Sequence, residues 1–250
     1  MIEIDGSMHS GSGTVLRYAV ALAALRAEPL RIRNIRARRA KPGLRPQHLQ
    51  AVRACAAFCG GQLRGDEVGS REIVFRPGRA REGGMFRFDI GTAGSATMLA
   101  FTLVPLALFA KTPSRFSLTG GLFQDFAPSA FYLRDVLLPH LECMGARTRL
   151  KIVRPGYVPK GGGQIVLDVD PLRSGLAPLE RLAQGRTRQV RGSALASHLA
   201  DEKVGERMAA RCRELLAGDA AVGRPDGDVV RPAELLAQAL PQAGLQHLGG

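Results

Sequence analysis

Two segments of the chain show the same succession of hydrophobic and polar positions. Each opens with a stretch in which apolar and polar side chains alternate, Ile2–Ser7 and Phe86–Thr92, as in a half-buried β-strand. A turn of small residues follows, and then an apolar helix that runs to about Leu25 in the first segment and Phe109 in the second. The pattern therefore predicts one strand and one helix at the start of each segment.

The rest of each segment matches as well, with a further strand, a second helix and two closing strands. The spacing between matching positions is roughly eighty residues, which is longer than the repeats of solenoid proteins. We expect an α+β fold of two tandem βαβαββ repeats, residues 1–80 and 81–175, with helices on one face of each sheet. These further elements are expected at Leu30–Ile35, Pro46–Cys59, Gln62–Arg64 and Glu72–Arg76, and at Arg115–Leu118, Pro128–Met144, Thr148–Val153 and Gln164–Val169.

The pattern changes after Pro171. We interpret residues 184–250 as part of a small inserted α/β domain and a tail. A helix is the clearest element there, because apolar residues recur at helical spacing. The expected elements are a strand at Gln189–Leu195, a helix at Asp201–Ala217, a loop at Asp219–Val230 and a short helix at Leu235–Leu240.

The composition favours a polyanionic partner. Lys and Arg number 35 against 22 Asp and Glu, which gives a net charge of +13 over 250 residues. Such an excess is typical of nucleic-acid-binding proteins, although a general arginine bias would produce the same count. Aromatic residues make up 5% and Trp is absent, so a base-stacking platform is not expected.

Cysteine usage and the apolar segments point to a reduced, cytoplasmic protein. Cys55 and Cys59 lie four apart on a predicted helix and fit a core, and no Cys-x-x-Cys pair indicates a metal site. The apolar run Met98–Ala110 is too short to span a bilayer and contains Pro105. We expect no metal ligand and no membrane association, and the sequence gives no indication of the oligomeric state.

The segment Ile35–Leu49 carries the strongest concentration of positive charge. Prolines and a glycine interrupt it, so it cannot form one continuous helix. Cations held on a rigid loop suit phosphate oxygens, because guanidinium groups bind them through two parallel hydrogen bonds. A solvated basic loop is the alternative interpretation. His48 follows the loop closely enough to contact a phosphate; the loop cations are Arg36, Arg38, Arg39, Lys41 and Arg45.

Two turns connect a strand to a helix in corresponding places, Gly6–Gly13 and Asp89–Ser95. Small residues there would let backbone N–H groups approach an anion at the helix N-terminus, or they form flexible turns. Arg17, near the first turn, is either a phosphate ligand or a surface cation. The glycine-rich segment Tyr157–Gly163 is best explained as a long β-turn.

Several of these segments together resemble the RNA 3′-terminal phosphate cyclase family. The resemblance is strong from Met1 to about Asp170, weaker from Arg188 to Gly218, and is not traced beyond Gly218. The segments that carry it are Ile4–Ser7, Leu16–Arg17, Ile35–Ala37, Lys41–Leu49, Phe75–Gly78, Gly91–Ser95, Lys160–Gly163 and Gly205–Ala209.

The resemblance implies a chemistry and a set of ligands. In this family a histidine near the C-terminus attacks the α-phosphate of ATP and carries AMP, with a divalent metal such as Mg²⁺. AMP passes to an RNA 3′-phosphate, and the neighbouring 2′-hydroxyl closes a 2′,3′-cyclic phosphate. The resemblance assigns the RNA phosphate to Arg17, Arg36, Arg39 and Gln47, and the nucleotide to Gly91, Thr92, Gly94 and Ser95.

The chain also departs from the family pattern, mainly on the ATP side. The family's nucleophilic histidine motif is not present, so the catalytic residues are unknown. Ser10 replaces an acidic residue, Phe101 replaces a glutamine used for ATP, and Gly120–Asp125 differs from the family's loop. The proposed RNA-phosphate residues are intact. This combination predicts a homologue that binds RNA ends and has little or no cyclase activity.

Three functions therefore compete. The first is an ATP-dependent RNA 3′-terminal phosphate cyclase. The second is a non-catalytic scaffold that binds RNA ends or takes part in ribosomal RNA processing. The third is a transferase related to the enolpyruvyl synthases, which share a repeated fold. The sequence motif at Lys41–Leu49 argues against it, because it resembles the cyclase family.

Overall fold

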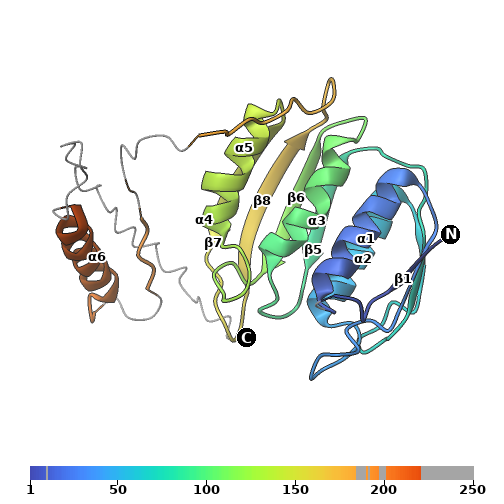
Figure 1. Ribbon diagram of the computed structural model, residues 1–250, viewed down its shortest axis with the longest axis horizontal. Coiled ribbons are helices and arrows are strands. Elements are labelled where there is room, and N and C mark those ends of the chain that lie inside the picture. The colour runs from blue at the N-terminus through green and yellow to red at the C-terminus, as the bar shows by residue number, and fades with distance from the viewer. Residues whose placement is uncertain (10, 184–189, 191, 197–200, 221–250) are drawn as a thin grey trace, which may run out of the picture. The chain divides into compact units, whose positions relative to one another are not determined.

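A computed structural model describes the chain except for residues 10, 184–189, 191, 197–200 and 221–250. Its contacts divide the chain into a larger unit, Met1–Leu179, and a second unit, Glu180–Gly250. The larger unit contains two four-stranded sheets, each covered by helices on one face (Figure 1). The α+β fold class expected from the sequence is confirmed.

The two sheets have the same topology. In each sheet the first two strands are parallel, and the other neighbouring pairs are antiparallel. The first has the order β1-β2-β4-β3 and the second the order β5-β6-β8-β7. The strands are β1 (Ile2–Asp5), β2 (Leu30–Arg33), β3 (Gln62–Arg64), β4 (Ile73–Arg76), β5 (Gly84–Asp89), β6 (Ser114–Gly120), β7 (Arg147–Arg154) and β8 (Gly163–Asp170).

The helices of the two repeats differ in one respect. The segment expected as a single helix, Pro128–Met144, contains a π-helical turn. Pro139 has no N–H to donate to the carbonyl four residues earlier, and the π turn lies just before it. The helices are α1 (Gly13–Arg26), α2 (Pro46–Cys59), α3 (Ala96–Leu108), α4 (Ala130–Tyr132), the π turn η1 (Leu133–Leu137) and α5 (Leu138–Cys143).

One hydrophobic core runs through both repeats. Helix α3 packs against both α1 and α2, so helices of the first repeat contact a helix of the second. Phe58 of α2 places its ring 5.2 Å from that of Phe86 on β5 and 5.9 Å from that of Phe116 on β6. The expected core positions Cys55 and Cys59 are buried. The boundaries 1–80 and 81–175 stay predictions.

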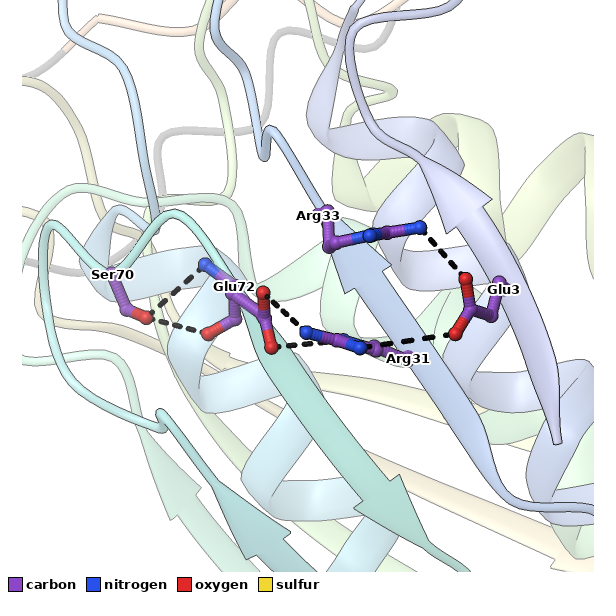
Figure 2. A network of polar contacts seen from close by, with 5 residues as sticks. All are labelled: Glu3, Arg31, Arg33, Ser70 and Glu72. Atoms are coloured by element: carbon purple, nitrogen blue, oxygen red, sulfur yellow. Dashed lines mark hydrogen bonds and ion pairs between the residues drawn. The ribbon is translucent and has the colours of Figure 1, made fainter.

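Part of the arginine excess is neutralised on the first sheet. Arg31 pairs with Glu72 at 3.0 Å and lies 3.8 Å from Glu3, and Arg33 pairs with Glu3 at 2.7 Å (Figure 2). Ser70 accepts from and donates to the backbone of Glu72. The hydrogen bond to Glu72 raises the pKa of Arg31. These cations already have carboxylate partners, unlike the buried Arg17 described below, which forms no salt bridge with the described residues.

The second unit agrees only partly with the sequence-based expectation. Helix α6 spans Val204–Ala220, three residues later at both ends than expected, and it includes the start of the expected loop. Met208 and Leu215, two of the apolar residues whose helical spacing predicted this helix, are exposed. The expected strand Gln189–Leu195 is wrong where it can be checked, because residues 190 and 192–195 form no strand. Residues 221–230 of the expected loop, the expected helix Leu235–Leu240 and His198 lie outside the described residues.

Candidate anion-binding site

The N-termini of three helices meet around the start of α2. The ring of His48 on α2 lies against Gly13 at the start of α1. The adjacent Gln47 accepts a hydrogen bond from the backbone of Ser95, the residue before α3. The basic loop expected from the sequence ends at the same point, at Arg45. The fold thus brings segments from both repeats to one place.

Arg17 is a buried cation in the first turns of α1. Its side chain is 7% exposed, and its Nη2 donates to the hydroxyl of Thr14 at 3.3 Å. Its Nε is buried without a hydrogen-bond partner. No carboxylate in the described part of the chain pairs with it. Burial lowers its pKa. A buried, uncompensated guanidinium is costly, which favours a site for an anion over the surface cation also considered.

His48 is buried beside Arg17 as a neutral imidazole. Burial, followed by the nearby charges of Arg17, Arg36 and Arg45, lowers its pKa to about 3. The backbone N–H of Arg45 donates to its Nδ1 at 3.3 Å, which assigns the ring proton to Nε2. A Cβ at Gly13 would lie 2.0 Å from that Nε2. Glycine is therefore required for the two helix N-termini to approach.

The basic loop is held in shape by one of its own arginines. Arg36 adopts a positive φ of 53° and donates from Nη1 to the carbonyls of Lys41 at 2.9 Å and Gly43 at 3.1 Å. Partial burial lowers its pKa, and the charges of Arg45 and Arg39 lower it further. Mutual repulsion among these cations would be relieved by a bound anion. Arg39 is exposed and forms no ion pair with the described residues.

The turn Gly91–Ser95 does not present an open cradle for a phosphate. The N–H of Gly91 donates to the Asp89 carboxylate at 2.7 Å, and that of Gly94 to the Thr92 hydroxyl at 3.2 Å. The N–H of Ser95 donates to Gln47. Three of the donors expected to bind a nucleotide are thus engaged within the chain. The turn before α1 is likewise organised from within, because Asp5 accepts from Ser7.

The site offers little to a metal or to ATP. No group of three or more His, Cys, Asp or Glu side chains suited to a metal ion occurs in the described part of the chain. The N–H groups engaged in the turn before α3 are not free to hold the phosphates of ATP, and we derive no catalytic step through an Mg²⁺–ATP complex. The segment Tyr157–Gly163 forms the turn between β7 and β8, as expected.

Sequence reasoning found some of these residues and missed others. Arg17 and Arg36 lie near enough to His48 for their charges to lower its pKa, Gln47 precedes His48 on α2, and Arg39 lies on the loop before α2. The burial of His48 was missed, although the glycine at position 13 was a signal that a bulky group approaches there.

Comparison with known proteins gives the same family as the residue pattern. A sequence model described as RNA 3′-terminal phosphate cyclase matches residues 8–242, beyond the Gly218 limit expected from the sequence. The chain is similar to RNA 3′-terminal phosphate cyclases from Nitrosospira multiformis, 46% identical over 80% of this chain and 57% of the relative, and Desulfurococcus amylolyticus, 42% over 79% and 54%.

A third similar protein, from Pseudomonas fluorescens, is 44% identical over 86% of this chain and 61% of its own length. It carries the same name. The chain thus spans roughly three fifths of the length of the curated relatives it matches. On this similarity, across most of its residues, the chain belongs to the RNA 3′-terminal phosphate cyclase family.

Proposed function

We propose that this chain binds RNA ends that carry a 3′-phosphate, the substrate class of its family. The supporting observation is the buried Arg17, whose Nε lacks a hydrogen-bond partner, next to a loop whose cations form no salt bridge within the described part of the chain. A phosphate would supply the missing charge and acceptors. Arg17, Arg36, Arg39 and Gln47 are the proposed contacts, with Arg36 also holding the loop.

The ATP-dependent half of the family reaction has weaker support in this chain. The backbone N–H donors of Gly91, Gly94 and Ser95 are already used within the chain. Nucleotide binding at Gly91, Thr92, Gly94 and Ser95 with Mg²⁺ therefore stays a prediction from the family. A non-catalytic RNA-end-binding or ribosomal RNA processing role is the second candidate, favoured by the same engaged turn.

We include a reduced, cytoplasmic setting in the proposal, as expected from the cysteine usage of the sequence. The four cysteines are free, and two of them are exposed. Among the described residues, no helix has the length and apolar character needed to cross a membrane. RNA is the proposed partner.

Fluorescence anisotropy with one short labelled RNA tests the proposal. The same sequence is prepared with a 3′-phosphate and with a 3′-hydroxyl, and both affinities are measured at fixed salt. We expect binding of the 3′-phosphate to be about tenfold tighter, because one charge-assisted contact set is worth that much. Equal affinities would show that binding is nonspecific electrostatics and would reject the proposal.

A further inference from the structure

A buried chain of hydrogen bonds leaves the candidate site through Ser95. The N–H of Ser95 donates to Gln47 Oε1 at 3.1 Å. The Ser95 hydroxyl lies 2.7 Å from that of Thr97, and the Thr97 hydroxyl donates to the carbonyl of Pro128 at 2.6 Å. Ser95 and Thr97 are 3% and 1% exposed. These hydrogen bonds connect α2, the start of α3 and the loop before α4.

The donor and the acceptor of every hydrogen bond in this series can be assigned. A carbonyl only accepts, so the one hydroxyl proton of Thr97 goes to Pro128. The Ser95 hydroxyl must then donate to Thr97, while its oxygen accepts from the N–H of Met98 at 3.0 Å. The backbone N–H of Ser95 can only donate, and it donates to Gln47, which fixes the Gln47 oxygen as the acceptor. The Ser95–Thr97 hydroxyl bond thus reaches Gln47 only by holding Ser95 in position.

Fixing that oxygen also determines what Gln47 can offer a ligand. Its Nε2 amino group, with two donors, forms no hydrogen bond with the described residues. A Cβ at Gly94 would lie 2.9 Å from Cβ of Gln47, so the side chain is also confined sterically. Gln47 can therefore present donors, but not its acceptor, to a bound group. Donors alone suit an anion.

We propose that Thr97 is a positioning residue of the phosphate site. It fixes Ser95 and, through Ser95, turns the amide donors of Gln47 toward the phosphate. This inference rests on the proposed function, because the role of Gln47 as a phosphate contact comes from it. Thr97 itself does not touch the ligand. Thr97 affects the difference in affinity between RNA with a 3′-phosphate and RNA with a 3′-hydroxyl. A purely structural threonine would leave this difference unchanged.

Three variants of α3 test the inference in the anisotropy assay described above. Thr97→Val removes the hydroxyl and keeps the shape, whereas Thr97→Ser keeps the hydroxyl. Thr102→Val is the matched control, since Thr102 is also 1% exposed and donates to a backbone carbonyl, that of Met98 at 2.9 Å. We expect Thr97→Val to reduce the preference for the 3′-phosphate about fivefold, as for one lost hydrogen bond. Thr97→Ser and Thr102→Val should keep it within about twofold.

A double-mutant cycle with Gln47→Leu tests whether Thr97 acts through Gln47. If Thr97 acts through Gln47, adding Thr97→Val to Gln47→Leu should reduce the phosphate preference no further. Additive losses, or an unchanged preference in Thr97→Val, overturn the inference even if that variant unfolds at a lower temperature. The wild-type result separates the two proposals. A wild-type protein without phosphate preference rejects both, whereas a preference that survives Thr97→Val rejects only this one.

Discussion

At the scale of single residues, the candidate site is defined by charges without partners. Arg31 and Arg33 have carboxylates beside them, whereas Arg17 is buried and pairs with no carboxylate among the described residues. His48 next to it is kept neutral by burial and by the cations around it. A neutral imidazole adds a donor without adding to the repulsion. The candidate site is therefore positive but not uniformly charged.

His48 should make stability depend on pH. Its pKa is about 3 in the folded chain, below the ordinary value of 6.5, so the unfolded state binds the proton first as pH falls. Stability is then lost below pH 6.5, down to about pH 3, by up to ~1.4 kcal/mol per pH unit. Thermal unfolding between pH 7 and pH 4 should show a shallower slope for His48→Gln. The exposed His140→Gln is the control, and equal slopes for both variants would contradict the assignment.

Gly13 should tolerate no side chain. Its added Cβ would lie 2.0 Å from His48 Nε2, so Gly13→Ala must push α1 and α2 apart. We expect a loss of roughly 2 kcal/mol or more in the free energy of unfolding. Gly175→Ala is the matched control, because nothing lies within 4 Å of its added Cβ. Similar urea midpoints for the two variants would show that the helices are not in close contact.

At the scale of elements, the helices and strands that follow from local hydrophobic spacing could be predicted from the sequence. Alternation and helical spacing identified the strands and helices of both repeats, and the loop from Arg36 to Arg45 was placed beside its helix correctly. The π turn before Pro139 was not predicted, because hydrophobic spacing does not separate it from an α-helix. The engaged donors of the Gly91–Ser95 turn were not predicted either, since they depend on Gln47 from the other repeat.

The two sheets should unfold together. Phe58 on α2 contacts Phe86 and Phe116 of the second sheet, so the repeats share their core. Phe58→Ala should cost about 3–5 kcal/mol and speed hydrogen exchange in both sheets. Phe126→Ala, at a fully exposed ring, should leave both unchanged. Faster exchange confined to one sheet would show that the repeats are independent.

At the scale of the whole molecule, two halves of a family reaction are unequally supported. The cations proposed to hold the RNA phosphate lie together in one unit. The backbone N–H groups of Gly91, Gly94 and Ser95, which are the proposed nucleotide contacts, are instead engaged within the chain.

The purified chain should form no stable adenylate. Nucleophilic catalysis needs an activated side chain held near the α-phosphate, and none of the five histidines belongs to the family's motif. Incubation with ATP labelled at the α-phosphate, followed by denaturing electrophoresis, should give no labelled band. An acid-labile band that disappears when one histidine is changed would identify a nucleophile and contradict this expectation.

The central claim, recognition of a 3′-phosphate by the basic loop, is tested most directly by changing Arg39. Arg39→Ala should weaken binding of a 3′-phosphorylated RNA by roughly 1–3 kcal/mol and leave the 3′-hydroxyl RNA almost unaffected. Arg33→Ala, which removes a cation already paired with Glu3, is the control and should change neither affinity by more than a small electrostatic amount. Equal losses for the two RNAs in Arg39→Ala would show that the loop attracts nucleic acid only as a charged surface.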